Sequence, residues 1–125
     1  MSDGNENTKR IAELNDRFRL RFNMPFLNEA LAVPGDIVAT RSVIDLAAQV
    51  QVSIWEMVRR FDAFDEGDDP HGEHDFGAFD VEGAPEKILW KIDYYADASR
   101  ESGSEDPSDI TRCYRVLTIM LASEW

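Results

Sequence analysis

The sequence predicts an α+β fold, with a small antiparallel sheet of three to four strands and two helices packed on one face. Two observations predict this class. Residues 1–61 place apolar side chains at helical spacing, whereas residues 75–122 contain β-branched and aromatic runs separated by turn residues. With 125 residues, of which 43% are hydrophobic, the chain can bury one core. We therefore expect a single domain over residues 1–125.

The first helix is predicted to run from about Asn5 to Phe22. Ile11, Leu14 and Phe18 recur at the spacing that places them on one helical face. Acidic residues near its start and arginines near its end complement the helix dipole. The chain thus begins with an amphipathic helix suited to covering a sheet.

A short strand is predicted at Glu29 to Val33. The Pro34–Gly35 pair that follows is a turn signal. This strand would be the fourth member of the sheet.

A second helix is predicted from Ser42 to about Phe64. Ser42 is placed as its N-cap, with Asp45 three residues later, which resembles a capping box. Its buried stripe is predicted to comprise Val43, Ala47, Val50, Ile54, Met57, Val58 and Phe61. Further apolar positions indicate cover on more than one side, namely Ile44, Val52 and Trp55.

A β-hairpin is predicted beyond residue 74. The runs DFGAFDVE at 75–82 and KILWKIDYYA at 87–96 flank a Gly-Ala-Pro connection. One face of the second run is predicted to carry Ile88, Trp90, Ile92 and Tyr94.

The last apolar run, residues 110–122, fits either a helix or a strand. Tyr114 and Leu117 have helical spacing, whereas Val116 and Ile119 are β-branched. We predict a strand, because an isolated two-stranded hairpin is only marginally stable.

Charge is concentrated in residues 62–86, here called the acidic segment. It contains ten acidic residues, both histidines and no Lys or Arg, and the chain as a whole has a net charge of −12. Such a segment repels nucleic acid and anionic membrane surfaces and attracts basic protein surfaces. We therefore expect no direct binding to nucleic acid or membrane.

Several strings of this sequence resemble a family of small uncharacterised bacterial proteins. These are GEHDFG at 72–77, WKIDYY at 90–95 and RVLTIMLASEW at 115–125, and NDRFR at 15–19 looks like the first helix of that family. The family pattern commonly has Tyr where this chain has His71. The resemblance implies no activity. It implies an accessory role, because members are often encoded on plasmids and other mobile elements.

The first functional hypothesis is a non-enzymatic interaction protein whose anionic loop and strand bind a basic protein surface. The partner would be a nucleic-acid-handling protein of a host defence complex of the restriction or CRISPR type, blocked by mimicry of nucleic-acid charge. The residues predicted to contact it are Asp62, Asp65, Glu66, Asp68, Asp69, Glu73, Asp80 and Glu82.

Two alternatives remain at this point. The first is a small metal-dependent enzyme with a divalent cation held by Asp69, His71, Glu73 and His74, since imidazole and carboxylate suit such ions. The second is a structural partner or subunit without catalytic activity, which could form a homo-oligomer through a face that carries Trp90, Tyr94, Tyr95 or Trp125. The interaction hypothesis itself requires no cofactor.

Other features of the sequence point to a cytoplasmic protein. Cys113 is the single cysteine, which suits a reducing compartment, and the polar N-terminus predicts no signal peptide. Cys113 lies in an apolar run, where a thiol ordinarily acts as a small hydrophobe and not as a nucleophile. No Gly-rich phosphate loop or Ser-centred elbow is found.

Overall fold

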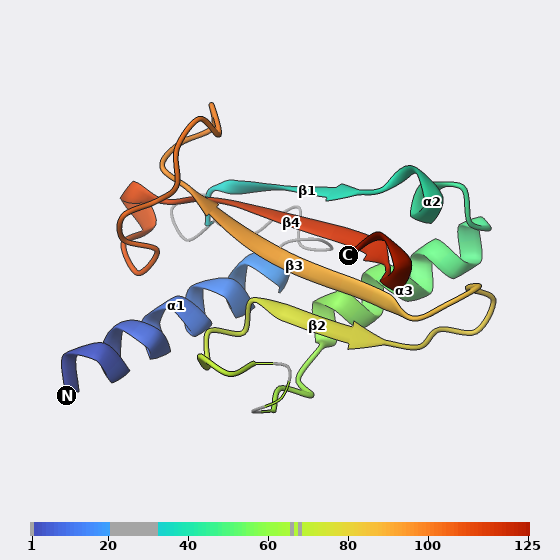
Figure 1. The fold of residues 1–125 in the computed structure, drawn as a ribbon, viewed down its shortest axis with the longest axis horizontal. Coiled ribbons are helices and arrows are strands. Elements are labelled where there is room, and N and C mark those ends of the chain that lie inside the picture. The colour runs from blue at the N-terminus through green and yellow to red at the C-terminus, as the bar shows by residue number, and fades with distance from the viewer. Residues whose placement is uncertain (1, 21–32, 66, 68) are drawn as a thin grey trace.

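The computed structural model describes residues 2–20, 33–65, 67 and 69–125. They form an α+β domain with one four-stranded sheet in the order β1-β4-β3-β2 (Figure 1). The elements in chain order are α1 (Ser2–Leu20), β1 (Gly35–Ala39), α2 (Arg41–Ile44), α3 (Ala48–Arg60), β2 (Phe76–Phe79), β3 (Ile88–Tyr95), the 3-10 turn η3 (Ile110–Arg112), β4 (Tyr114–Leu121) and the 3-10 turn η4 (Ala122–Glu124).

The sheet contains both parallel and antiparallel pairs, whereas an antiparallel sheet was predicted. Strands β2, β3 and β4 form the antiparallel part, and the hairpin and the final strand are confirmed. Strand β1 is parallel to β4, with Gly35 opposite Arg115 and Ala39 opposite Ile119. A parallel pair needs a long crossover, and here α2, α3 and the whole hairpin lie between the two strands in sequence.

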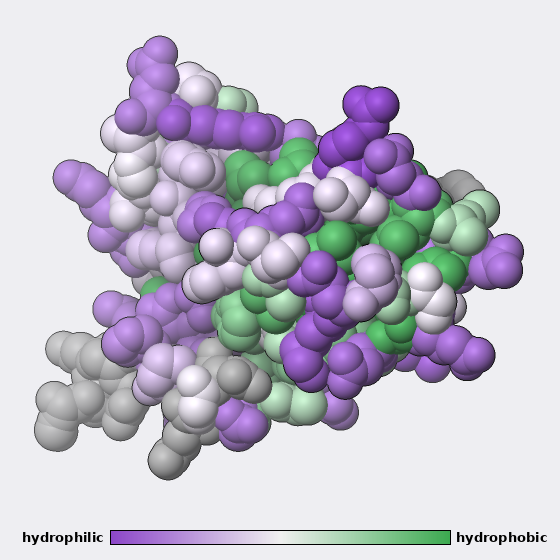
Figure 2. Space-filling view, turned by 45° about the vertical axis from the view of Figure 1, so that its right-hand side comes forward, coloured by the Kyte–Doolittle hydropathy of each residue, from purple (hydrophilic) through white to green (hydrophobic). Residues whose placement is uncertain are grey.

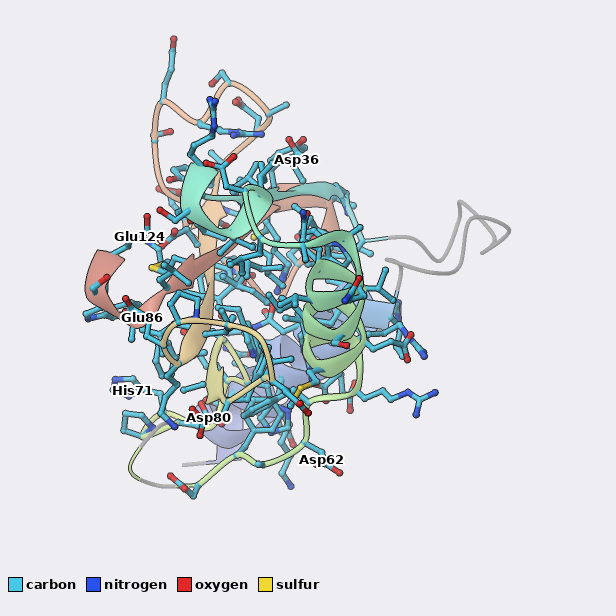
Figure 3. All side chains as sticks on the ribbon, turned by 90° about the vertical axis from the view of Figure 1, so that its right-hand side faces the viewer. Asp36, Asp62, His71, Asp80, Glu86 and Glu124 are labelled. Atoms are coloured by element: carbon cyan, nitrogen blue, oxygen red, sulfur yellow. The ribbon has the colours of Figure 1, made fainter. Side chains whose placement is uncertain are left out.

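Helices α1 and α3 lie on one face of the sheet, whereas η4 lies on the other (Figures 1 and 3). The core is therefore built between α1, α3 and the inward side chains of the strands. The residues predicted for one face of β3 are confirmed there, because Ile88, Trp90 and Ile92 are buried in the core. The core is completed from the helices by Leu14, Phe18, Val43, Val50, Ile54 and Val58, and from the other strands by Phe79, Leu117, Ile119 and Leu121.

The predicted helix over residues 42–64 is wrong as a single element. It is divided into α2 and α3, with Thr40 and Ala47 as their N-caps and not Ser42. The Gln51 side chain donates hydrogen bonds at 2.8 Å to the carbonyls of Ile44 and Leu46, and so satisfies the backbone at the break. No Gly or Pro marks this break in the sequence.

The expectation that this region is covered on more than one side is also wrong. Val43, Val50, Ile54 and Val58 are buried, but Val52 is 61% exposed. Ala47, Ile44 and Met57 are exposed as well, and Trp55 and Phe61 are partly buried. Helix α3 therefore presents one face to the core and the opposite face to solvent.

The predictions for residues 21–35 have different outcomes. The strand at Glu29 to Val33 lies outside the described residues except for Val33, which is buried but in no strand. The predicted turn at Pro34 and Gly35 is wrong, since β1 begins at Gly35. The first helix is confirmed, although α1 begins at Ser2.

Candidate partner-binding surface

The acidic segment begins after α3 on the helical side of the sheet; His74 contacts α1 on that side, whereas His71 lies in the pocket with Trp125 on the opposite side. Asp62 and Asp80 lie in the lower part of Figure 3 together with His71, far from Asp36 at the top. Asp62, Asp65, Asp80 and Glu82 are exposed. Asp80 also accepts a hydrogen bond from Lys87 at 3.2 Å. Half of the residues predicted to contact a partner thus lie at the surface.

The other predicted contact residues have different positions. Glu66 and Asp68 lie outside the described residues. Asp69 is only 7% exposed. Glu73 is partly buried, and its Oε1 accepts a hydrogen bond from the Tyr94 hydroxyl at 2.9 Å. Asp69 and Glu73 therefore hold the segment in place.

Asp69 fixes the loop from within. Its carboxylate accepts hydrogen bonds from the backbone N–H of His74 at 3.2 and 3.3 Å. Its own N–H donates to the Asp65 carbonyl at 2.7 Å, and the Gly72 N–H donates to its carbonyl at 3.1 Å. His74 has a φ of 57°, in the left-handed region that non-glycine residues rarely adopt. These hydrogen bonds hold the backbone of His74 in that conformation.

The His74 ring connects the acidic segment to α1. Its Nδ1 is 3.0 Å from both carboxylate oxygens of Asp16, and its Nε2 is 3.9 Å from Oδ2 of Asp69. The ring stacks on Phe64 with 3.9 Å between centroids and 2° between planes. Both ring nitrogens thus face carboxylates of the protein itself, an arrangement suited to anchoring.

Arg19 extends this contact to the end of α3. Its guanidinium is almost fully buried and donates at 2.9 Å to the carbonyls of Val58 and Phe61, and at 2.6 Å to Asp16. Val58 lies in the last turn of α3 and Phe61 is the C-cap of that helix, where backbone carbonyls lack the regular partners of a helix interior. Burial lowers the pKa of Arg19, and the hydrogen bond to Asp16 partly opposes this shift. We call Asp16, Arg19, Asp69 and His74 the His74 network.

A second network, named here the Arg115 network, consists of Asn15, Glu73, Tyr94 and Arg115. The Arg115 Nε donates to Oδ1 of Asn15 at 2.5 Å, and its Nη2 donates to the Pro107 carbonyl at 2.7 Å. The Asn15 amide donates at 2.9 Å to the Glu73 carbonyl and at 2.8 Å to the Tyr94 hydroxyl. The network thus ties α1, the acidic segment, β3 and β4 together.

Burial perturbs the ionisable groups of the Arg115 network. Arg115 is 0% exposed, and desolvation lowers its pKa. Desolvation likewise raises the pKa of Tyr94, and the nearby charges of Glu73 and Asp75 add to the rise. Tyr94 therefore remains a neutral hydrogen-bond donor at ordinary pH.

Two hollows flank the acidic segment. A cleft of about 530 Å³ lies where α1 and α3 end, lined by Asp16, Arg19, Leu20, Arg59, Arg60, Phe61, Asp62, Phe64 and His74. A pocket of about 370 Å³ lies on the side of the sheet without helices, lined by Gly67, Pro70, His71, Asp75, Phe76, Lys91, Ile92, Asp93 and Trp125. The acidic segment contributes to both.

The four residues predicted as metal ligands do not form one cluster. Asp69 and His74 approach each other, but Glu73 contacts Tyr94 and His71 is exposed in the pocket beside Trp125. Among the described residues, no group of three or more His, Cys, Asp or Glu side chains has an arrangement that would hold a metal ion. Cys113 is buried, and desolvation raises the pKa of its thiol.

Sequence reasoning missed Asn15, Asp16, Arg19, Tyr94 and Arg115 as parts of these networks. One signal was present for Arg115, because strand alternation places it on the same face as Leu117, Ile119 and Leu121. An arginine on a buried face needs partners for its charge. For Asp16 and Arg19 the signal is weaker, namely their place in the string NDRFR, since arginines near a helix end commonly lie in solvent.

The chain belongs to a protein family of unknown function, DUF3768, whose model matches residues 39–124. The match includes all of the acidic segment and all four strands except for most of β1. No curated protein and no solved structure matches the chain. Within the described residues, no helix has the length and apolar character needed to cross a membrane.

Proposed function

We propose that this protein is a small acidic interaction protein that binds a basic protein surface through its acidic segment. The observation that supports this proposal best is the anchoring of that segment. Asp69, Glu73 and His74 make internal contacts, whereas Asp62, Asp65, Asp80 and Glu82 are exposed on the same segment.

Anchoring matters because ordering a flexible chain on binding costs free energy. Here the His74 and Arg115 networks connect the segment to α1, α3, β3 and β4 before any partner arrives. The exposed carboxylates are therefore presented on a preorganised backbone. Such a surface also attracts a basic partner over a distance, which speeds association at low salt.

The type of partner is the second part of the proposal. Basic protein surfaces with clustered Lys and Arg are typical of proteins that bind nucleic acid. A row of carboxylates can occupy such a surface and exclude the phosphates. We propose a nucleic-acid-handling component of a host defence complex as the target, in keeping with the mobile-element resemblance of the sequence.

The test uses a panel of purified bacterial nucleic-acid-binding proteins with basic surfaces, immobilised for biolayer interferometry. We expect binding to at least one of them at 50 mM NaCl, with a large loss of affinity at 300 mM NaCl. Duplex DNA added in solution should compete. The variant Asp62→Asn, Asp65→Asn, Asp80→Asn, Glu82→Gln should bind at least about tenfold more weakly, as expected for losing several charge contacts.

A matched control removes the same number of charges elsewhere. Glu6, Glu13, Glu101 and Glu105 are exposed and lie outside the acidic segment. Their combined replacement by Gln should reduce affinity much less. Equal losses in the two variants would mean that only net charge matters, and unchanged binding of the acidic-segment variant would refute the proposed surface.

A further inference from the structure

The pocket beside Trp125 continues the proposed binding surface around the β2 edge of the sheet. Its lining joins the acidic segment, through Pro70, His71, Asp75 and Phe76, to β3 and to Trp125. The pocket opens on the side of the sheet that α1 and α3 do not cover, where η4 lies (Figure 3). A partner bound to the acidic segment would therefore lie over its mouth.

Trp125 gives the pocket an accessible aromatic wall. It is 69% exposed, more than any other large apolar residue among those described. Its ring packs edge-on against Phe76, with 5.1 Å between centroids and 70° between planes. Hydrophilic residues cover most of the face shown in Figure 2, with apolar residues between them. An exposed indole held by a second ring is a suitable surface for stacking a flat cation.

The two carboxylates that line the pocket, Asp75 and Asp93, differ in their ion pairs. Asp93 pairs with Lys91 at 2.9 Å. Asp75 is half-buried, and within the described part of the chain its side chain forms no ion pair. Burial raises the pKa of Asp75, the charges of Glu73 and Asp69 add to this rise, and the nearby His71 opposes it only in part. Binding a cation would remove this penalty.

We propose that this pocket binds one arginine side chain of the basic partner. The guanidinium would stack on Trp125 and donate hydrogen bonds to Asp75. Arginine fits better than lysine because its planar group can stack on an indole and present several donors to one carboxylate. The inference rests on the proposed function and adds the residue that the partner must supply.

The test measures binding of two short peptides by NMR titration, with the backbone amide signals of His71, Asp75 and Phe76 as the reporters, because these residues line the pocket and their amides are present in every variant. The probes are acetylated and amidated Lys-Lys-Arg-Lys-Lys and its all-lysine counterpart. The wild-type protein should bind the arginine peptide about three- to fivefold more tightly at low salt, the size of one exposed cation–π contact. Trp125→Ala should abolish this preference, and Trp125→Phe should retain part of it.

Asp75→Asn should weaken binding of the arginine peptide more than binding of the lysine peptide. The control variant is Glu101→Gln, which changes an exposed acid of a distant loop and should affect the affinity for both peptides equally. Because Trp125 is exposed, we expect its variants to melt at the wild-type temperature. The variant with Asp62, Asp65, Asp80 and Glu82 replaced should bind both peptides more weakly and should keep the preference for the arginine peptide.

The outcomes separate the two proposals. Salt-sensitive binding of both peptides with an arginine preference that survives Trp125→Ala would overturn the pocket and leave the acidic surface intact. Equal affinity of the wild-type protein for the two peptides would overturn the pocket in the same way. If neither peptide binds at low salt, the result would count against the acidic surface itself, and the pocket proposal would fail with it.

Discussion

Arg115 is a buried cation held chiefly by neutral groups. Its hydrogen bonds go to the Asn15 side chain and the Pro107 carbonyl, and its guanidinium lies 5.2 Å from the Tyr94 ring centroid. The remaining Nη1 has no hydrogen-bond partner among the described residues. Burying such a group is costly, so each existing hydrogen bond matters for stability.

The first prediction at this scale concerns Asn15. Asn15→Ala would remove the acceptor of Arg115 and the donor for the Glu73 carbonyl and the Tyr94 hydroxyl. We expect a loss of about 2–4 kcal/mol in the free energy of unfolding, since buried polar groups would be left unpaired. Urea denaturation measures this change in the free energy of unfolding. Asn7→Ala, at an exposed position of the same helix, should change stability little. Similar losses in both variants would contradict the role given to Asn15.

The second prediction concerns Asp75, whose raised pKa has a consequence for stability. Above its ordinary pKa of 3.8 the carboxyl ionises in the unfolded chain, whereas the folded protein retains the proton to a higher pH. In that window the folded state binds more protons, so ionisation of Asp75 lowers stability as pH rises.

Asp75→Asn should therefore raise the melting temperature at pH 7, and the gain should disappear well below pH 3.8, where the group is protonated in both states. Thermal melts of the wild-type protein and of Asp75→Asn, from pH 7 down to the acidic range, measure this difference in melting temperature. A variant less stable than wild type at pH 7 would show that the carboxylate is not an unfavourable group.

At the scale of single elements, β1 depends on the glycine where it begins. A Cβ at Gly35 would overlap the Arg115 carbonyl and the Phe18 ring. At this point β1 joins β4, since the Arg115 N–H donates to the Pro34 carbonyl at 3.1 Å. The close approach of strand and helix is therefore possible only without a side chain.

The third prediction follows from this contact. Gly35→Ala should destabilise the protein by about 3 kcal/mol or more, because both β1 and α1 would have to move. Gly103→Ala is a matched control, since its nearest atom beyond neighbouring residues would be the Tyr94 carbonyl oxygen at an ordinary 3.7 Å. Urea denaturation of the two variants compares them. Equal stability of Gly35→Ala and Gly103→Ala would refute the crowding argument.

On the scale of the whole molecule, four strings distant in sequence meet in two polar networks. NDRFR supplies Asn15, Asp16 and Arg19, and GEHDFG supplies Glu73 and His74. WKIDYY and RVLTIMLASEW add Tyr94 and Arg115. The family match begins at residue 39, yet α1 contributes to both networks. The helix is thus an integral part of the domain that holds the acidic segment.

The sequence by itself determined the α+β class, the first helix, the hairpin and the final strand. Each of these has a strong local signal, such as the alternation of Ile88, Trp90 and Ile92 or the helical spacing of Leu14 and Phe18. It also located the charge in one segment, because charge density needs no structure to be counted.

Only the tertiary structure decided the place of β1, the break between α2 and α3, and the roles of individual charged residues. Strand β1 is stabilised by β4, its partner far along the chain, and the helix break by the side chain of Gln51. Asp69 and Asp80 look alike in sequence, but one is buried in the His74 network and the other is exposed. Which carboxylates anchor the acidic segment and which face solvent depends on packing against α1, and that packing joins residues far apart in the chain.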